Sequence, residues 1–183
     1  MIAEVTDYWK EEVKSRVVKI VFGPELWLAV VVALAFGYYG PRAHLDKIKV
    51  TAVVSAALNY SAIAFGFAVT GMTLAISIPH RTLTLRMAKE HVGNSIKCLY
   101  SDLLFVFSWT ALAHLFAVLL FLLIIAFIPD DRMLFSIPPL RCERIAACGT
   151  AFVVSYCLFQ FCITIITLSQ VGAAYIEELK KEI

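Results

Sequence analysis

The sequence predicts an all-α membrane protein, a four-span transmembrane helical bundle preceded by an amphipathic N-terminal helix. Of the 183 residues, 61% are hydrophobic and only 16% are charged, and the mean hydropathy is +0.82. Soluble domains contain about 45–50% apolar residues. The charged residues gather between long apolar runs, which is typical of a polytopic membrane protein. Membrane lipid is therefore an expected partner, whereas a net charge of +2 is too small to predict nucleic acid.

Residues 1–22 predict the amphipathic helix. Apolar residues share one side of it: Ile2, Val5, Trp9, Val13, Val17 and Ile20. Four acidic residues offset four basic ones here, so attraction to anionic lipid is not its main property. We expect this helix to lie at the membrane surface or to pack against a cytoplasmic protein partner. Gly23-Pro24 ends it, and proline suits the first turn of the next helix.

Four apolar runs form one membrane domain, residues 23–176. The predicted spans are residues 25–40, 50–78, 103–128 and 145–170. A helix rises about 1.5 Å per residue, so the last three are long enough for a hydrocarbon core of about 30 Å, and the first is short. Residues 80–102 form the loop between the second and third spans. Residues 177–183 form the charged end of the last helix, where pairs of Glu and Lys favour helix.

The distribution of basic residues predicts the orientation. With four spans, the N-terminus, the 80–102 loop and the C-terminus share one side of the membrane. Ten of the sixteen Lys and Arg residues belong to these three segments, and six belong to the other two loops. Cytoplasmic loops carry an excess of Lys and Arg, so we expect both termini in the cytoplasm.

The second span carries the most informative pattern. No charged residue lies between Lys49 and Arg81, and small or polar residues recur at the helical period along one side. This small-polar stripe consists of Ala52, Ser55, Asn59, Ala62, Gly66, Thr70, Thr73 and Ser77. Hydrocarbon offers Asn, Ser and Thr no hydrogen-bond partner, so we expect this side of the helix to contact protein or water. Two interpretations remain open: a seam on which helices pack closely, and the lining of an aqueous pore.

Three polar residues lie near the middle of the second, third and fourth spans: Asn59, His114 and Gln160, respectively. In antiparallel helices they fall at similar depth, which predicts a polar layer at mid-membrane. Such residues are costly in lipid unless they are paired or hydrated, so each is a functional candidate, with interhelical hydrogen bonding as the alternative. Asp and Glu occur only at the ends of the spans. A proton-coupled antiporter usually needs an embedded carboxylate, so that class is not expected.

The five cysteines, Cys98, Cys142, Cys148, Cys157 and Cys162, contain no CxxC pair and are interpreted as small buried residues. We expect no metal and no cofactor. The loop between the second and third spans carries His80 and an R-x4-H pattern, Arg86 and His91. This pattern resembles the Arg and His of HEPN ribonucleases. On one continuous helix the two side chains would point about 140° apart, which favours a solvated basic surface over an active site, so no enzyme is expected.

A short multi-pass chain with an R-x4-H loop resembles the small membrane accessory proteins of type VI-B CRISPR systems. More broadly, it is similar to compact membrane effectors of bacterial antiviral defence. This resemblance covers the architecture and residues 86–91, and it implies a bacterial inner-membrane protein that assembles into homo-oligomers and permeabilises the membrane. Because four helices in one protomer cannot both enclose a water-filled path and bury their contacts, a pore requires several copies. We therefore expect an oligomeric channel or pore, and the alternative is a non-conducting assembly subunit of a membrane complex.

Overall fold

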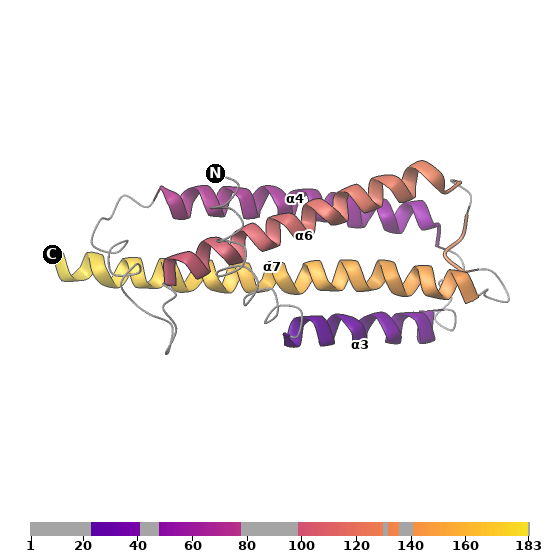
Figure 1. Ribbon diagram of the computed structural model, residues 1–183, viewed down its shortest axis with the longest axis horizontal. Coiled ribbons are helices and arrows are strands. Elements are labelled where there is room, and N and C mark those ends of the chain that lie inside the picture. Colours follow the sequence, from indigo (N-terminus) through magenta and orange to yellow (C-terminus); the bar gives the residue numbers. More distant parts are fainter. Residues whose placement is uncertain (1–22, 41–47, 78–98, 130–131, 136–140, 183) are drawn as a thin grey trace, which may run out of the picture. The chain divides into compact units, whose positions relative to one another are not determined.

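The structure is a computed structural model, and it describes residues 23–40, 48–77, 99–129, 132–135 and 141–182. The described residues form four α-helices (Figure 1): α3 (Pro24–Tyr39), α4 (Val50–Ile76), α6 (Leu99–Phe127) and α7 (Arg141–Glu182). The all-α class predicted from the sequence is confirmed. The predicted amphipathic helix of residues 1–22 lies outside the described residues, as does most of the loop of residues 80–102.

Three of these helices are long and apolar enough to cross a membrane. They comprise Val50–Ile76, Leu103–Phe127 and Arg141–Ala173. The fourth, α3, has 16 residues and reaches only about 24 Å, which is less than the hydrocarbon core of about 30 Å. Its start follows the sequence signals, because Gly23 is the N-cap and Pro24 occupies the first turn. Whether α3 crosses the bilayer decides on which side the N-terminus lies, so the cytoplasmic location of both termini stays a prediction.

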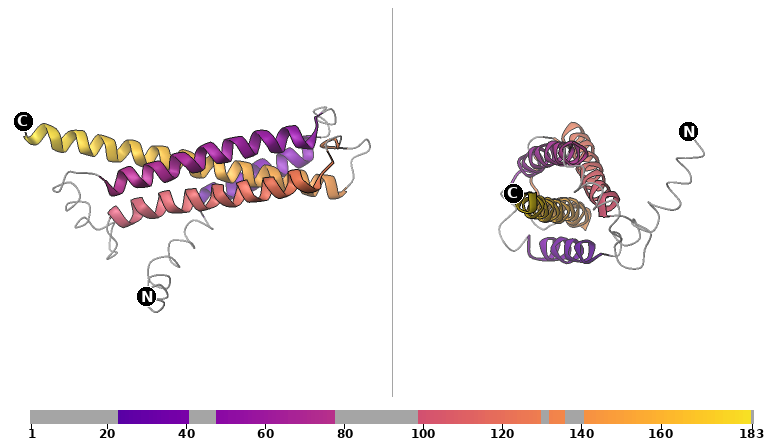
Figure 2. Two further views of the ribbon diagram at one scale, coloured as in Figure 1. Left: turned by 90° about the horizontal axis from the view of Figure 1, so that it is seen from above. Right: turned by 90° about the vertical axis from the view of Figure 1, so that its left-hand side faces the viewer.

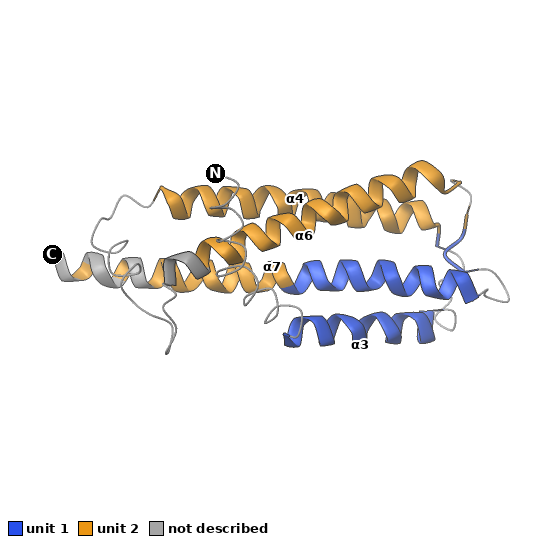
Figure 3. Ribbon diagram, viewed as in Figure 1, with its two compact units in different colours: residues 1–48, 133–159 blue, residues 49–132, 160–183 orange. Residues whose placement is uncertain are grey.

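The chain divides into two compact units, shown in Figure 3. Unit 1 consists of residues 1–48 and 133–159, and unit 2 consists of residues 49–132 and 160–183. The long helix α7 contributes its first part to unit 1 and the remainder to unit 2.

Unit 1 contains α3, the segment before α7 and the first part of α7. The buried residues of α3 are Ala29, Ala33 and Gly37, which recur every four residues and form a line of small side chains on one side of the helix. A Cβ atom at Gly37 would collide with Sγ of Cys148, so glycine is required for this approach to α7. Phe135 is buried, and its ring lies 6.5 Å from the ring of Phe36. Leu134 N–H donates to the carbonyl of Ile48 over 2.8 Å.

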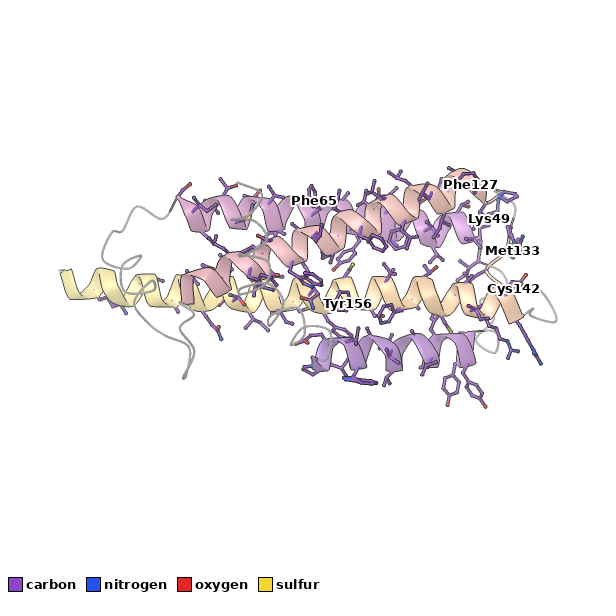
Figure 4. All side chains as sticks on the ribbon, viewed as in Figure 1. Lys49, Phe65, Phe127, Met133, Cys142 and Tyr156 are labelled. Atoms are coloured by element: carbon purple, nitrogen blue, oxygen red, sulfur yellow. The ribbon has the colours of Figure 1, made fainter. Side chains whose placement is uncertain are left out.

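Unit 2 is built on an antiparallel pair of helices, α4 and α6, which lie side by side in both views of Figure 2. Lys49 at the start of α4 and Phe127 at the end of α6 lie at the same end of the pair (Figure 4). At this end Val50 N–H donates to the carbonyl of Arg132 over 3.0 Å. At the other end Ala75, Leu103 and Phe107 form a buried apolar cluster, which Leu168 and Val171 of α7 complete. The second part of α7 therefore runs parallel to α4.

Small residues on α4 face large residues on α6. We call the buried side of α4 the inner face: Val54, Ala57, Ser61, Ala64, Ala68, Gly71 and Ala75. The buried residues of α6 are Leu103, Phe107, Thr110, His114, Ala117 and Phe121. Both sets alternate steps of three and four residues, the spacing of helices that pack along a coiled-coil seam. A Cβ atom at Gly71 would collide with the ring of Phe107, so these two residues fix the register of the pair.

Candidate functional site

The small-polar stripe lies on the outside of unit 2. All eight of its residues, from Ala52 to Ser77, are exposed, whereas all seven residues of the inner face are buried. At about 100° per residue the two sets lie about half a turn apart on α4. A Cβ atom at Gly66 would meet no atom within 4 Å. Among the described residues, the seam on which α4 packs is therefore the inner face, and none of them packs closely against Gly66 of the small-polar stripe.

Two hydroxyl groups of the stripe are satisfied by their own helix. The Thr70 hydroxyl donates to the carbonyl of Gly66 over 2.9 Å, and the Thr73 hydroxyl donates to the carbonyl of Val69 over 3.0 Å. Such bonds to the preceding turn remove the only donor of each threonine from its surroundings. Asn59 is different, because its exposed carboxamide carries two N–H donors and one carbonyl acceptor. Asn59 is thus the stripe residue for which lipid is the least suitable neighbour.

Two of the three residues of the predicted polar layer are buried in the protein. His114 on α6 is fully buried, and Gln160 on α7 is 5% exposed. Asn59 does not join them, because it points to the outside of α4, and its neighbour Tyr60 takes that place. The Tyr60 ring lies 5.8 Å from the His114 ring and 6.2 Å from the Phe161 ring. One helical step of 100° separates the two directions, which the depth of Asn59 in the span could not predict.

A chain of hydrogen bonds links the buried polar residues of α6 and α7. Nδ1 of His114 lies 2.8 Å from the carbonyl of Thr110, one turn earlier on α6. The hydroxyl oxygens of Thr110 and Thr164 lie 2.7 Å apart across the two helices, and the Thr164 hydroxyl donates to the carbonyl of Gln160 over 2.9 Å. Both threonines are fully buried. We refer to Thr110, His114, Gln160 and Thr164 as the buried polar cluster.

Sequence reasoning named His114 and Gln160 but did not pair Thr110 with Thr164. Both threonines belong to helical sides that the sequence marks as polar, since Thr110 precedes His114 by one turn and Thr164 follows Gln160 by one turn. That spacing is the signal which could have found them. The packing role of the inner face of α4 was not predicted either. Small residues occur on both sides of this helix, and only the polar side was interpreted as a contact surface.

Several predicted positions cannot be placed. His80, Arg86 and His91 lie outside the described residues. Within the described part of the chain, no group of three His, Cys, Asp or Glu residues could hold a metal ion. Of the cysteines interpreted as buried, Cys157 is buried and Cys148 is partly buried, whereas the interpretation is wrong for Cys142 and Cys162, which are exposed. No family model, curated protein or solved structure matches this chain.

Proposed function

We propose that this chain is the subunit of a homo-oligomeric membrane pore and that the small-polar stripe of α4 lines its path. The observation that carries the proposal is the exposure of the whole stripe, from Ala52 to Ser77, on a helix whose opposite side is fully buried. Three long apolar helices make the chain compatible with a membrane. The outside of such a protein meets lipid, a second protein or water.

The chemistry of the stripe disfavours lipid. Many other exposed residues of the membrane helices are large and apolar, for example Ile63 and Ile76 on α4 and Phe116 on α6. The stripe instead combines small side chains with an amide and hydroxyl groups over the whole length of α4. Small residues allow neighbouring helices to approach closely, and an amide in hydrocarbon is costly. A ring of identical subunits meets both requirements, since each stripe then borders its neighbours and a central path.

The finer proposal is that the pore permeabilises a bacterial inner membrane during antiviral defence. It is supported by the resemblance in architecture and by the R-x4-H pattern of Arg86 and His91. A loop with these basic residues is suited to bind a cytoplasmic protein partner that triggers assembly or opening.

The second candidate function is a non-conducting assembly subunit. The hydrogen bonds of Thr70 and Thr73 to their own backbone favour it, because hydroxyl groups satisfied in this way do not need water. In this case the stripe would contact one partner helix and line no path. The two candidates differ in whether the stripe is accessible to water, and this difference can be measured.

Cysteine accessibility tests the proposal. In a background without the five native cysteines, single cysteines are placed on the stripe at Asn59, Ala62, Gly66, Thr70 and Thr73. Controls are placed at Ile76, which is also exposed but lies beside the stripe, and at Ala64 and Ala68 of the inner face. Leu58 and Phe65, which lie away from the stripe, complete the set. The protein is reconstituted in lipid vesicles and treated with a small membrane-impermeant thiol reagent.

A pore predicts that the stripe positions react and that all control positions do not. Equal reactivity on and off the stripe would contradict a lining. Gly66→Leu separates the two candidates further, because it adds a bulky side chain without disturbing the protomer. Loss of ion conduction with an intact oligomer supports a lining, and loss of the oligomer supports a packing seam.

The oligomer itself is tested by mass photometry in mild detergent. The proposal requires particles that contain several copies of the 20.4 kDa chain. Monomers alone, at every detergent concentration that preserves the fold, would contradict both the pore and its self-association.

A further inference from the structure

We propose that Nε2 of His114 accepts a hydrogen bond from a water molecule buried inside unit 2. This site lies between α4, α6 and α7, on the opposite side of α4 from the small-polar stripe, and it does not depend on the proposed pore. The argument proceeds from the tautomer of His114 to the donors around it.

The contact of Nδ1 fixes the tautomer. Nδ1 lies 2.8 Å from the carbonyl oxygen of Thr110, which has lone pairs and no hydrogen. Nδ1 must therefore carry the proton and donate. In the neutral imidazole ring, Nε2 then holds a lone pair and needs a donor. Nε2 is buried and has no hydrogen-bond partner among the described residues. An acceptor buried in this way loses its bond to water on folding and gains nothing in return.

The nearby threonines cannot supply the donor. The Thr164 hydroxyl has one hydrogen, and it goes to the carbonyl of Gln160 at 2.9 Å. At 2.7 Å the two threonine oxygens share one hydrogen, and because that of Thr164 is already used, Thr110 donates it. The hydroxyl hydrogens of Thr110 and Thr164 are thus both engaged in other hydrogen bonds.

The shape of the surroundings favours a small donor. The rings of Tyr60 and Phe161 lie 5.8 Å and 6.1 Å from the His114 ring, both in edge-to-face arrangements. Starting from the contact of Gly71 with Phe107, a count of seven residues along each antiparallel helix brings Ala64 opposite His114. His114 is fully buried, so only a small molecule fits beside Nε2. Water is the smallest molecule that donates an O–H, and buried waters typically serve groups of this kind.

Solid-state NMR of the full-length protein in lipid bilayers tests the site. The protein is labelled with ¹⁵N at histidine, and the His114→Gln variant identifies the His114 signal by its loss. We expect a neutral ring protonated at Nδ1, with an Nε2 resonance shifted towards the hydrogen-bonded range and correlated with water protons. A ring protonated at Nε2, or an Nε2 without any correlation to water, would overturn the proposal.

The Tyr60 hydroxyl is another candidate donor, since the Tyr60 ring lies 5.8 Å from the His114 ring, and Tyr60→Phe tests it. This change removes the hydroxyl and keeps the ring. If water is the donor, the Nε2 shift and its correlation with water persist. Their loss in a folded Tyr60→Phe protein would assign the bond to Tyr60 and refute the water site. Should this variant fail to fold, the wild-type spectrum still decides, because tyrosine and water protons give different correlations with Nε2.

Discussion

The inner face and the small-polar stripe of α4 are both rich in small residues. Of these two sets, only the inner face packs against another helix among the described residues. Gly71 on the inner face lies against the buried ring of Phe107. Gly66 on the stripe meets nothing, although it lies only five residues earlier. Small size on the inner face is therefore explained by packing against α6. On the stripe no described residue of the protomer explains it, and this contrast is the main reason for proposing an assembly.

The largest expected effect on stability comes from adding a side chain at Gly71. Gly71→Ala adds a Cβ atom that collides with the Phe107 ring, which is fully buried and cannot move aside freely. We expect a loss of about 1–3 kcal/mol in the free energy of unfolding. Unfolding in mixed micelles, followed by tryptophan fluorescence, measures it.

Gly66→Ala is the matched control for that change. It adds the same methyl group to the same helix, where no atom opposes it. The unfolding free energy should stay the same or rise by up to about 1 kcal/mol, because alanine is the better helix former. Equal destabilisation by the two variants would show that packing against Phe107 does not distinguish the two faces in the free energy of unfolding.

A second glycine pair extends the comparison to unit 1. Gly37→Ala brings a Cβ atom against Sγ of Cys148, whereas Gly149→Ala meets nothing within 4 Å. A thiol can turn about one bond, so the cost at Gly37 should be smaller than at Gly71, about 0.5–1.5 kcal/mol. The same unfolding assay reports it. A Gly149→Ala protein that is less stable than the Gly37→Ala protein would contradict this, because Gly149 would then be the glycine in the more closely packed position.

A smaller effect is expected from the hydroxyl pair of the buried polar cluster. Thr110→Val and Thr164→Val each remove one side of the 2.7 Å contact between α6 and α7. A double-mutant cycle of unfolding free energies should give a coupling of about 0.6 kcal/mol, the average for such bonds in membranes. Additive single effects would mean that the two hydroxyl groups do not interact.

The smallest effect on folding is expected from Thr70→Val. It retains the shape of the side chain and removes a hydroxyl that bonds only to its own helix. The free energy of unfolding should change by less than about 0.5 kcal/mol. If the stripe lines a path, this variant nevertheless lowers its conductance, because the wall becomes less wettable. Unchanged conductance in planar bilayers would favour the assembly subunit over the pore.

The fold class could be predicted because it depends on composition along the chain. Long runs without charge predicted the four helices of the described residues, and Gly23-Pro24 predicted the start of α3. The starts were less predictable: α6 begins at Leu99 and α7 at Arg141, each before its predicted span, whereas the helical end expected over residues 177–183 is present up to Glu182. A change in hydropathy marks where lipid contact ends, whereas a helix continues as long as its backbone hydrogen bonds do.

The candidate site could be predicted only in part, because the rotation of each helix about its axis is set by its neighbours. The sequence identified the small-polar stripe as a distinct side of α4 and named His114 and Gln160 as functional candidates of a polar layer at mid-membrane. It could not tell that Tyr60 rather than Asn59 turns towards His114. That choice depends on Phe107 fitting against Gly71, and one sequence contains no measure of this contact between distant segments.

The hydroxyl bonds of Thr70 and Thr73 have a consequence for biogenesis. In the proposed assembly, a newly made subunit would enter the bilayer and persist there before it meets another copy. During this interval the stripe faces acyl chains, and the carbonyls of Gly66 and Val69 already accept the threonine hydrogens. The unassembled protein is thereby spared much of the desolvation penalty of its polar side. Asn59 has more polar groups than such bonds can serve, so it is the residue by which quality control could distinguish an orphan subunit from an assembled one.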